Sequence, residues 1–147
     1  MTRHRRGVVL FSAAVSLALV AAACDSGGET IEVTLQEFAV GLSDSSASAG
    51  EITFEATNDG PNDVHEFVIL RTDLGATELP TDETGSVDEE GEGIEVVDEI
   101  EDIAVGDTPT LTVDLDAGNY VLICNIYDED EQESHYQEGM RTSFTVE

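Results

Sequence analysis

The sequence predicts an all-β domain, a Greek-key β-sandwich that carries one long acidic surface excursion. Several short segments alternate apolar and polar residues with a period of two, which indicates strands that bury one face. Clusters of Gly, Asn, Asp and Pro separate these segments and predict turns. About seven strands of this kind are typical of a sandwich, and the length of 147 residues allows one domain plus a leader.

The first residues, 1–23, have a basic start, an apolar run and small residues at the end, which predicts a signal peptide. The run is short for a membrane span. Its ending, LVAAAC, resembles a bacterial lipobox, which implies that Cys24 is lipidated and anchors the protein to the outer face of the cell membrane. Residues 24–29 then form a flexible tether. The alternative is plain secretion, with Cys24 free or paired to Cys124.

The domain is expected to span residues 30–147. Residues 30–38 and 51–57 alternate as half-buried strands, and 39–50, rich in Ser, Ala and Gly, indicates a connection. After the turn NDGPND, the segment 64–70 is more continuously apolar, which favours a central strand. Side chains expected to face the core here are Ile31, Val33, Leu35, Ile52, Phe54 and Ala56.

Residues 71–109 are dense in Asp and Glu and predict the long surface excursion. A short local helix within it would place its apolar residues on one face. The alternative is an edge strand that runs through Ile94 and Val96. The carboxylates of the segment form either a solvated face or a docking surface. Apolar residues at helical spacing are Ile94, Val97, Ile100 and Ala104.

Three further strands are expected at 110–115, 120–126 and 142–147. The sequence DAGN, 116–119, predicts a hairpin-type turn between the first two. Because side chains alternate along a strand, Cys124 shares the inner face of its strand with Tyr120 and Leu122. Side chains expected to face inward are Leu111, Val113, Leu115, Tyr120, Leu122, Cys124, Phe144 and Val146.

The stretch 124–140 brings a thiol, an imidazole and a thioether together as Cys124, His135 and Met140, and a second imidazole, His65, begins the central strand. Two His nitrogens, one Cys sulfur and a weak axial Met select copper in a trigonal, electron-transfer geometry. After residue 24 the chain has no other His, Cys or Met. A buried thiol is ordinarily inert, whereas a bound metal deprotonates it.

Three motifs carry a resemblance to the cupredoxins, the blue type 1 copper proteins that include plastocyanin and azurin: NDGPNDVHEF, GNYVLIC and HYQEGM with its His-x4-Met spacing. The resemblance covers residues 30–147. It implies one copper ion per chain, with nitrogen ligands from His65 and His135, a short thiolate bond from Cys124 and a long axial contact from Met140. Candidates for hydrogen bonds to the Cys124 sulfur are a backbone amide next to His65, and the residues Asn58 and Asn125.

One feature departs from the family, because ten residues separate Cys124 from His135. The extra piece, YDEDEQES, must bulge outward, and surface loops tolerate such insertions. Its acids would crowd the patch where partners usually dock, and they favour a lower reduction potential. They lack the glycine and ligand series of an EF-hand, so a solvated loop is the simpler interpretation.

These observations predict an extracytoplasmic one-electron carrier, monomeric and not an enzyme, because no His remains for a second copper centre. Two arginines against 33 acids give the chain after residue 23 a charge of about −31, which disfavours nucleic acid. The expected partner is a redox protein with a basic surface, such as a c-type cytochrome or a terminal oxidase. The alternatives are copper delivery or buffering with the same ligands, and a metal-free sandwich used for adhesion or ligand binding.

Overall fold

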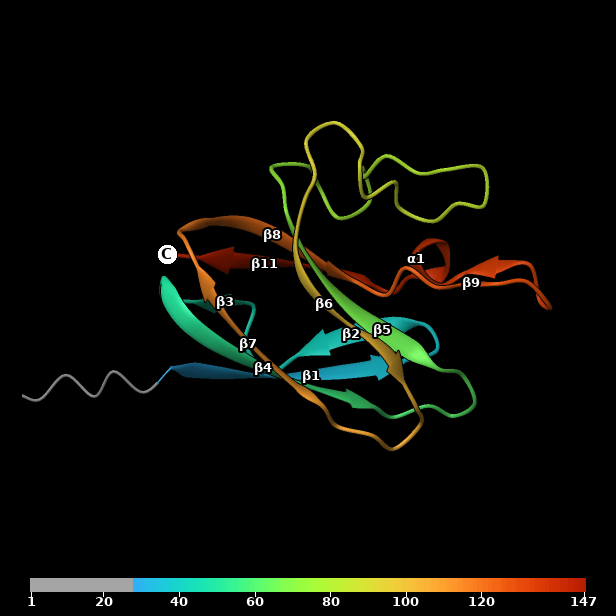
Figure 1. Cartoon of the computed structure of the whole chain (residues 1–147), viewed down its shortest axis with the longest axis horizontal. Helices are drawn as coiled ribbons and strands as arrows, with labels where there is room; N and C mark the ends of the chain where they lie inside the picture. Colours follow the sequence, from blue (N-terminus) through green and yellow to red (C-terminus); the bar gives the residue numbers. More distant parts are fainter. Residues whose placement is uncertain (1–27) are drawn as a thin grey trace, which may run out of the picture.

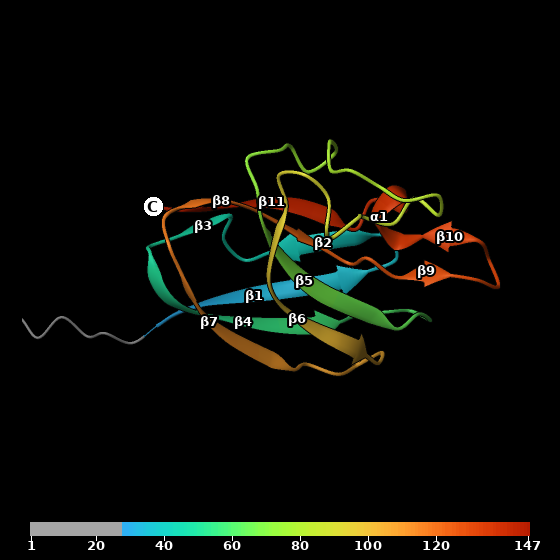
Figure 2. The same cartoon turned by 45° about the horizontal axis from the view of Figure 1, so that its top comes forward.

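The computed structural model describes residues 28–147 and confirms the all-β sandwich. One sheet holds, in order, β2 (Ala39–Leu42), β1 (Glu29–Gln36), β4 (Gly50–Asn58) and β7 (Thr110–Leu115). The facing sheet holds β3 (Ser46–Ala47), β11 (Arg141–Val146), β8 (Gly118–Ile123), β5 (His65–Arg71) and β6 (Glu95–Ile103). A ribbon of β9 (Tyr127–Asp128) and β10 (Glu133–Ser134) and the one-turn helix α1 (His135–Glu138) extend from one end, as Figures 1 and 2 show.

The predicted leader and Cys24 lie outside the residues that the structure describes. Within those residues, no helix has the length and apolar character needed to cross a bilayer.

The core lies between the two sheets and follows the predicted alternation. Along β1 and β4, which pair in parallel, every second side chain is buried. Phe54 of β4 packs its ring against Phe67 of β5 and Phe144 of β11, at centroid distances of 5.4 and 5.5 Å, and so joins the sheets. Buried members that the sequence predicted include Ile31, Val33, Leu35, Ile52, Ala56, Leu115, Tyr120, Leu122, Cys124 and Val146.

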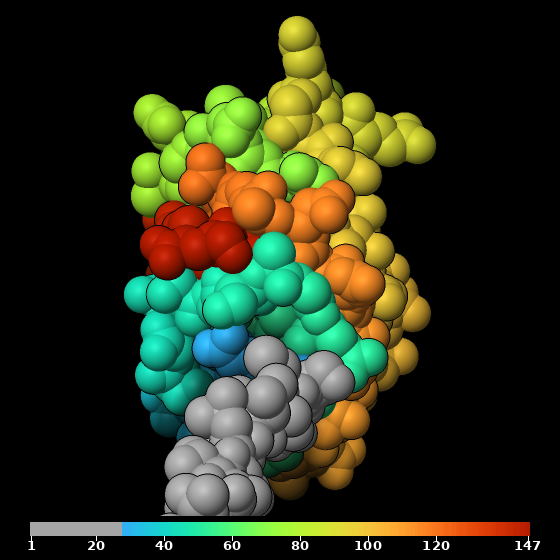
Figure 3. Space-filling view, turned by 90° about the vertical axis from the view of Figure 1, so that its left-hand side faces the viewer, coloured from blue at the N-terminus to red at the C-terminus, as the bar shows by residue number. Residues whose placement is uncertain are grey.

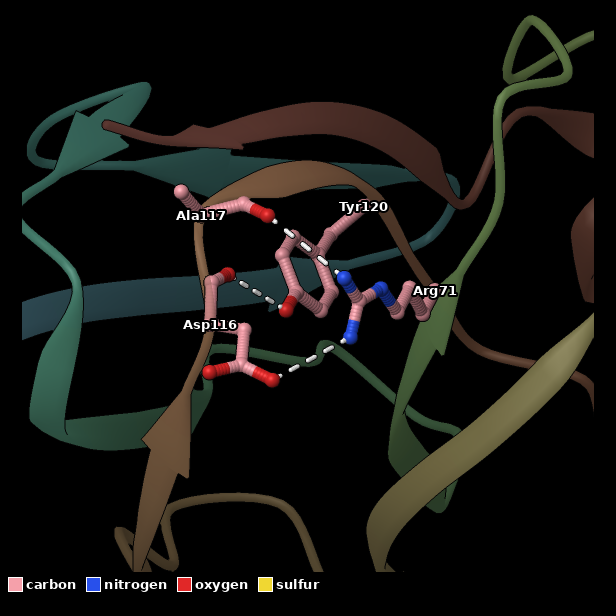
Figure 4. A network of polar contacts seen from close by, with 4 residues as sticks. All are labelled: Arg71, Asp116, Ala117 and Tyr120. Carbon is pink, nitrogen blue, oxygen red and sulfur yellow. Dashed lines mark hydrogen bonds and ion pairs between the residues drawn. The ribbon is translucent and has the colours of Figure 1, made fainter.

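Residues 116–119 do not form the predicted hairpin turn, because β7 pairs with β4 whereas β8 pairs with β5 and β11. The segment instead carries the chain from one sheet to the other. The Tyr120 hydroxyl donates to the Asp116 carbonyl oxygen at 2.8 Å, and the Arg71 guanidinium lies 6.0 Å from the Tyr120 ring centroid and 3.6 Å from the Asp116 carboxylate (Figure 4). This tyrosine corner fixes the crossing.

The predicted local helix within the acidic segment is also wrong, and the alternative edge strand is correct. β6 pairs with β5 through two register shifts. Each shift adds one residue to β6 relative to β5. The inward side chains of β6 therefore recur at every third position, a spacing that resembles that of a helix. Its acids point outward, which protects the exposed edge from pairing with another chain. The inward residues are Val97, Ile100 and Ile103.

The expected connection 39–50 is likewise partly strand, since it contains β2 and β3 at the sheet edges. The small residues that suggested a loop are accommodated because both strands are short and lie at an edge. Neither change moves the residues that carry the candidate site.

Residues 72–94, the loop part of the excursion, pack on the outer face of the five-stranded sheet (Figure 1). Leu79 and Val87 of this segment are buried there, at 6% and 4% exposure. The sheet is therefore covered on both faces at β5 and β8, which explains why residues 64–70 are continuously apolar. The outer cluster comprises Val68, Leu70, Leu79, Val87, Val121, Ile123 and Tyr136.

Candidate metal centre

The four predicted donors lie at one end of the sandwich because each begins or follows an element there. His65 is the first residue of β5, and Cys124 directly follows β8. His135 begins α1, and Met140 immediately precedes β11. The antiparallel pairing of β5 with β8, with Val68 opposite Ile123, brings the first two residues together across 58 intervening positions.

Three of the donors meet in one buried cluster. The Nδ1 atoms of His65 and His135 are 3.3 Å apart, and the Cys124 Sγ lies 3.9 and 3.4 Å from them. His65 and Cys124 are fully buried, and His135 is 2% exposed. Metal–nitrogen bonds of about 2.1 Å and metal–sulfur bonds of about 2.3 Å allow donors of one ion to be up to about 4.4 Å apart. One ion can therefore bind all three donor atoms.

Met140 is held beside the cluster by its backbone. The Cys124 amide donates to the Met140 carbonyl oxygen at 3.1 Å, and the Met140 amide donates to the His135 carbonyl oxygen at 2.9 Å. Gly139 permits this turn, because its φ is 134° and an added Cβ would lie 2.9 Å from the Phe38 carbonyl oxygen. The Met140 side chain is fully buried. Its role as an axial ligand stays a prediction.

The Cys124 sulfur accepts a hydrogen bond from the backbone amide of Glu66, the residue after His65, at 3.4 Å. Of the three predicted candidates, the structure thus selects the backbone amide. The Asn58 side chain instead donates to the carbonyl oxygens of Asp63 and Ile103, both at 2.8 Å, and fixes the loop before His65.

Burial sets the protonation of the cluster. It raises the pKa of the Cys124 thiol to about 12, against the backbone amides of Glu66 and Ile126, which favour the thiolate. Burial lowers the pKa of both imidazoles, and the charge of His135 adds to the effect at His65. The rings are therefore neutral ligands near pH 7, whereas the thiol must lose a proton to bind a metal.

Carboxylates lie on the solvent side of His135. This residue lines a hollow of about 450 Å³, and the carboxylates in its wall are those of Asp63, Asp102 and Asp128. Asp63, Asp128 and Glu37 each act on His135 in the direction that raises its pKa, although burial outweighs them. The remaining lining residues are Asn62, Val64 and Ile126.

The inserted loop bulges outward, as its length predicts, and forms a closed ribbon (Figure 2). The His135 amide donates to the Ile126 carbonyl oxygen at 2.9 Å and closes the base, above which β9 pairs with β10. Asp128 lies at the hollow, whereas residues 129–131 are exposed at the tip. The insertion therefore leaves the donor cluster intact.

Some contacts at the site were not predicted from the sequence. The Phe38 ring packs edge-on against the His135 ring at a centroid distance of 5.2 Å. The backbone amide of Asn125 donates to the Glu66 carboxylate at 2.8 Å. Asn125 and Glu66 each directly follow a predicted donor, and this position is the signal that identifies them. Phe38 has no such signal, because its proximity depends on the path of the chain between β1 and β2.

No family model and no curated protein sequence matches the chain. Solved structures do. Reduced auracyanin from Roseiflexus castenholzii is 21% identical with a TM-score of 0.56, over 82% of this chain and 98% of that one. Auracyanin A from Chloroflexus aurantiacus, a "blue" copper protein, is 19% identical with a TM-score of 0.54, over 82% of this chain and 100% of that one. An azurin from Methylomonas sp. strain J is 16% identical with a TM-score of 0.50, over 81% and 98%.

These likenesses show that the chain has the cupredoxin fold, so the predicted resemblance is confirmed at the level of the fold. The donor chemistry is an independent observation. Two neutral imidazoles and one thiol beside a buried methionine fit one copper ion per chain, because copper favours this mixed nitrogen and sulfur set.

Proposed function

We propose that the protein is a type 1 copper protein that carries single electrons. The observation that carries this proposal is the convergence of His65, Cys124 and His135 from distant parts of the chain on one buried point at one end of the sandwich. Bound copper would supply one-electron exchange between Cu(I) and Cu(II). The chain offers no comparable second cluster among its described residues, which supports a carrier over a copper enzyme.

The residues support this role by holding the donors still and dry. β5 and β8 fix His65 and Cys124 from within a buried sheet, and the Glu66 amide directs the sulfur. A donor set whose positions are fixed needs little rearrangement when the oxidation state changes. His135 lines the hollow and is the route by which electrons would enter and leave.

We place the protein at the outer face of a membrane, joined to it through Cys24. The described chain begins beside β1, at the end of the sandwich opposite α1 and the metal cluster (Figure 1). Figure 3 looks at that opposite end, where the start of β1 (blue), the segment before β4 (teal) and the C-terminal end of β11 (dark red) lie beside the orange part of the chain. An anchor there would leave the metal end directed away from the bilayer and open to a partner.

The partner that suits this surface is a redox protein with a basic face, such as a c-type cytochrome or terminal oxidase. Asp63, Asp102 and Asp128 line the hollow at His135, and opposite charges speed the encounter of two proteins. The deep burial of the donors favours retention of the metal, which supports a carrier over copper delivery.

The optical spectrum of the copper-loaded protein tests the proposal. We expect one Cu(II) per chain and an intense visible thiolate-to-copper band. Cys124→Ser should be folded and colourless, while Thr108→Val, at an exposed hydrogen bond to Thr57, should keep the band. A colourless wild type, or a coloured Cys124→Ser variant, would refute the proposal. Rapid loss of copper to an apo-acceptor, without electron exchange with a basic c-type cytochrome, would favour delivery.

A further inference from the structure

The acidic excursion contacts the metal-bearing segment at several places. The Tyr136 hydroxyl donates to the Ala76 carbonyl oxygen at 2.8 Å. The Ser134 hydroxyl and the Gln137 side-chain amide donate to the Gly85 carbonyl oxygen, at 3.0 and 3.2 Å. These three residues surround His135 in the chain, so the excursion holds both sides of this donor.

The same excursion also holds the other donor of the segment. The Asn125 side chain, directly after Cys124, accepts from the Val87 amide at 2.6 Å and donates to the Val87 carbonyl oxygen at 3.0 Å. It also donates to the Glu89 carboxylate at 2.9 Å. Residues 81–87 form a small hairpin of their own, through the bridge between Thr81 and Val87. The bonds therefore reach a folded unit and not a loose strand.

We propose that residues 72–94, which we call the clamp, are a positioning element that fixes Cys124 and His135 for the metal. This inference rests on the proposed function for its metal. No hydrogen bond joins the clamp to a donor side chain, and the clamp acts through Asn125, Ser134 and Tyr136. The long connection between Cys124 and His135 increases the conformational freedom that metal binding must restrict. The clamp restricts this freedom before the metal binds.

The packing of the clamp on the segment is close. Gly85 has a φ of 87°, and an added Cβ would lie 2.8 Å from the Gln137 Cγ and 3.6 Å from the Ser134 Cβ. Leu79 and Val87 bury Tyr136 against β5 and β8, and Tyr136 is 2% exposed. One hydrogen bond and an apolar contact thus act together at Tyr136, the residue that follows His135.

Two tyrosines give a matched test. Tyr136→Phe removes a phenol hydrogen bond of 2.8 Å at the clamp, and Tyr120→Phe removes one of the same length at the far end of the sandwich. Both should lower the folding equilibrium constant by roughly 2- to 10-fold. Only Tyr136→Phe should shift the thiolate–copper band and its paramagnetic spectrum and weaken Cu(II) binding. Amide exchange at residues 135–137 of the metal-free protein should also accelerate only in Tyr136→Phe.

Gly85→Ala, which pushes the clamp away from Gln137, should shift the thiolate–copper band to the same side as Tyr136→Phe does. Ser134→Thr, which keeps the hydroxyl, should resemble the wild type more than Ser134→Ala does. Equal spectra and equal amide exchange for the two tyrosine variants would overturn the proposal that the clamp positions Cys124 and His135. If the wild type forms no thiolate–copper band, the proposed function fails, and the amide exchange of the metal-free protein still decides whether the clamp holds this segment.

Discussion

At the scale of single residues, each of the three clustered donors is followed by a residue whose hydrogen bonds help to hold the cluster. Glu66, after His65, donates its amide to the sulfur, and its carboxylate accepts the amide of Asn125. Asn125, after Cys124, and Tyr136, after His135, bond to the excursion. Glu66 lies on β5, where successive side chains point to opposite faces, so its carboxylate is directed away from the side of His65 and can bond to Asn125.

The sequence singles out the three residues that the structure brings together, His65, Cys124 and His135, because their residue types are few and only one metal chemistry uses them together. Their role as ligands, and that of Met140, stays a prediction. It could not identify which amide approaches the sulfur. That contact depends on the register of β5 against β8, which the local pattern of either strand leaves open. The candidates Asn58 and Asn125 were chemically reasonable, yet the structure uses their side chains elsewhere.

Cys124 determines the pH dependence of metal binding. Burial raises the pKa of its thiol to about 12 and lowers the pKa of both imidazoles, so at pH 7 only the thiol holds a proton that a metal must displace. We expect about one proton released per Cu(II) bound, and an affinity that rises roughly tenfold per pH unit near neutrality. Titration calorimetry in buffers of different ionisation enthalpy measures the release. Cys124→Ser should release almost none, and a release of two or more protons would contradict the neutral imidazoles.

At the scale of elements, the reliable predictions were the strands with strict alternation, such as β1, β4 and β11. Period-two patterning identifies them because one face is buried and the other is wet. For β6 the sequence favours a helix and offers the edge strand only as the alternative, because the register shifts of this strand replace the period of two with a spacing of three. The crossing at 116–119 was missed because a Gly-Asn turn has the same residues whether the next strand returns to the same sheet or passes to the facing one.

The β9–β10 ribbon and the loop before His65 set the charge around the donors. Asp63 and Asp128 both act on His135 and line its hollow. Negative charge stabilises the more positive oxidised metal. We expect Asp63→Asn with Asp128→Asn to raise the reduction potential, by roughly tens of millivolts for charges screened near the surface.

Protein-film voltammetry at low ionic strength measures this change. The matched control is Glu51→Gln with Asp114→Asn, which removes two carboxylates that face each other across β4 and β7 at the far end. The control should leave the potential nearly unchanged. A fall in potential in the first variant, or an equal rise in both, would contradict the inference that the acids near His135 locally stabilise the oxidised metal.

At the scale of the whole molecule, the acidic surface is balanced by very few cations. Two arginines, Arg71 and Arg141, are the basic residues among positions 28–147, and the chain has no lysine. Within this range the one ion pair joins Arg71 to Asp116 at 3.6 Å, with side chains that are 40% and 86% exposed. Carboxylates also face each other directly in the four-stranded sheet, as Glu51 with Asp114 and Glu32 with Glu55. Folding therefore brings like charges together with little compensation.

This balance predicts that salt stabilises the metal-free protein. Screening weakens the repulsion between carboxylates, and the Debye length falls from about 10 Å at 0.1 M salt to about 3 Å at 1 M. Screening costs little attraction, because the single Arg71–Asp116 pair is open to solvent at Asp116 and solvent-accessible pairs contribute at most about 1 kcal/mol. We expect the urea midpoint of unfolding to rise steadily as NaCl increases over this range. Glu51→Gln with Asp114→Asn should raise the midpoint at low salt and reduce its dependence on salt, since two of the repelling charges are gone. A midpoint that falls with salt, or one whose salt dependence the double variant leaves intact, would show that repulsion between carboxylates does not limit the stability of this fold.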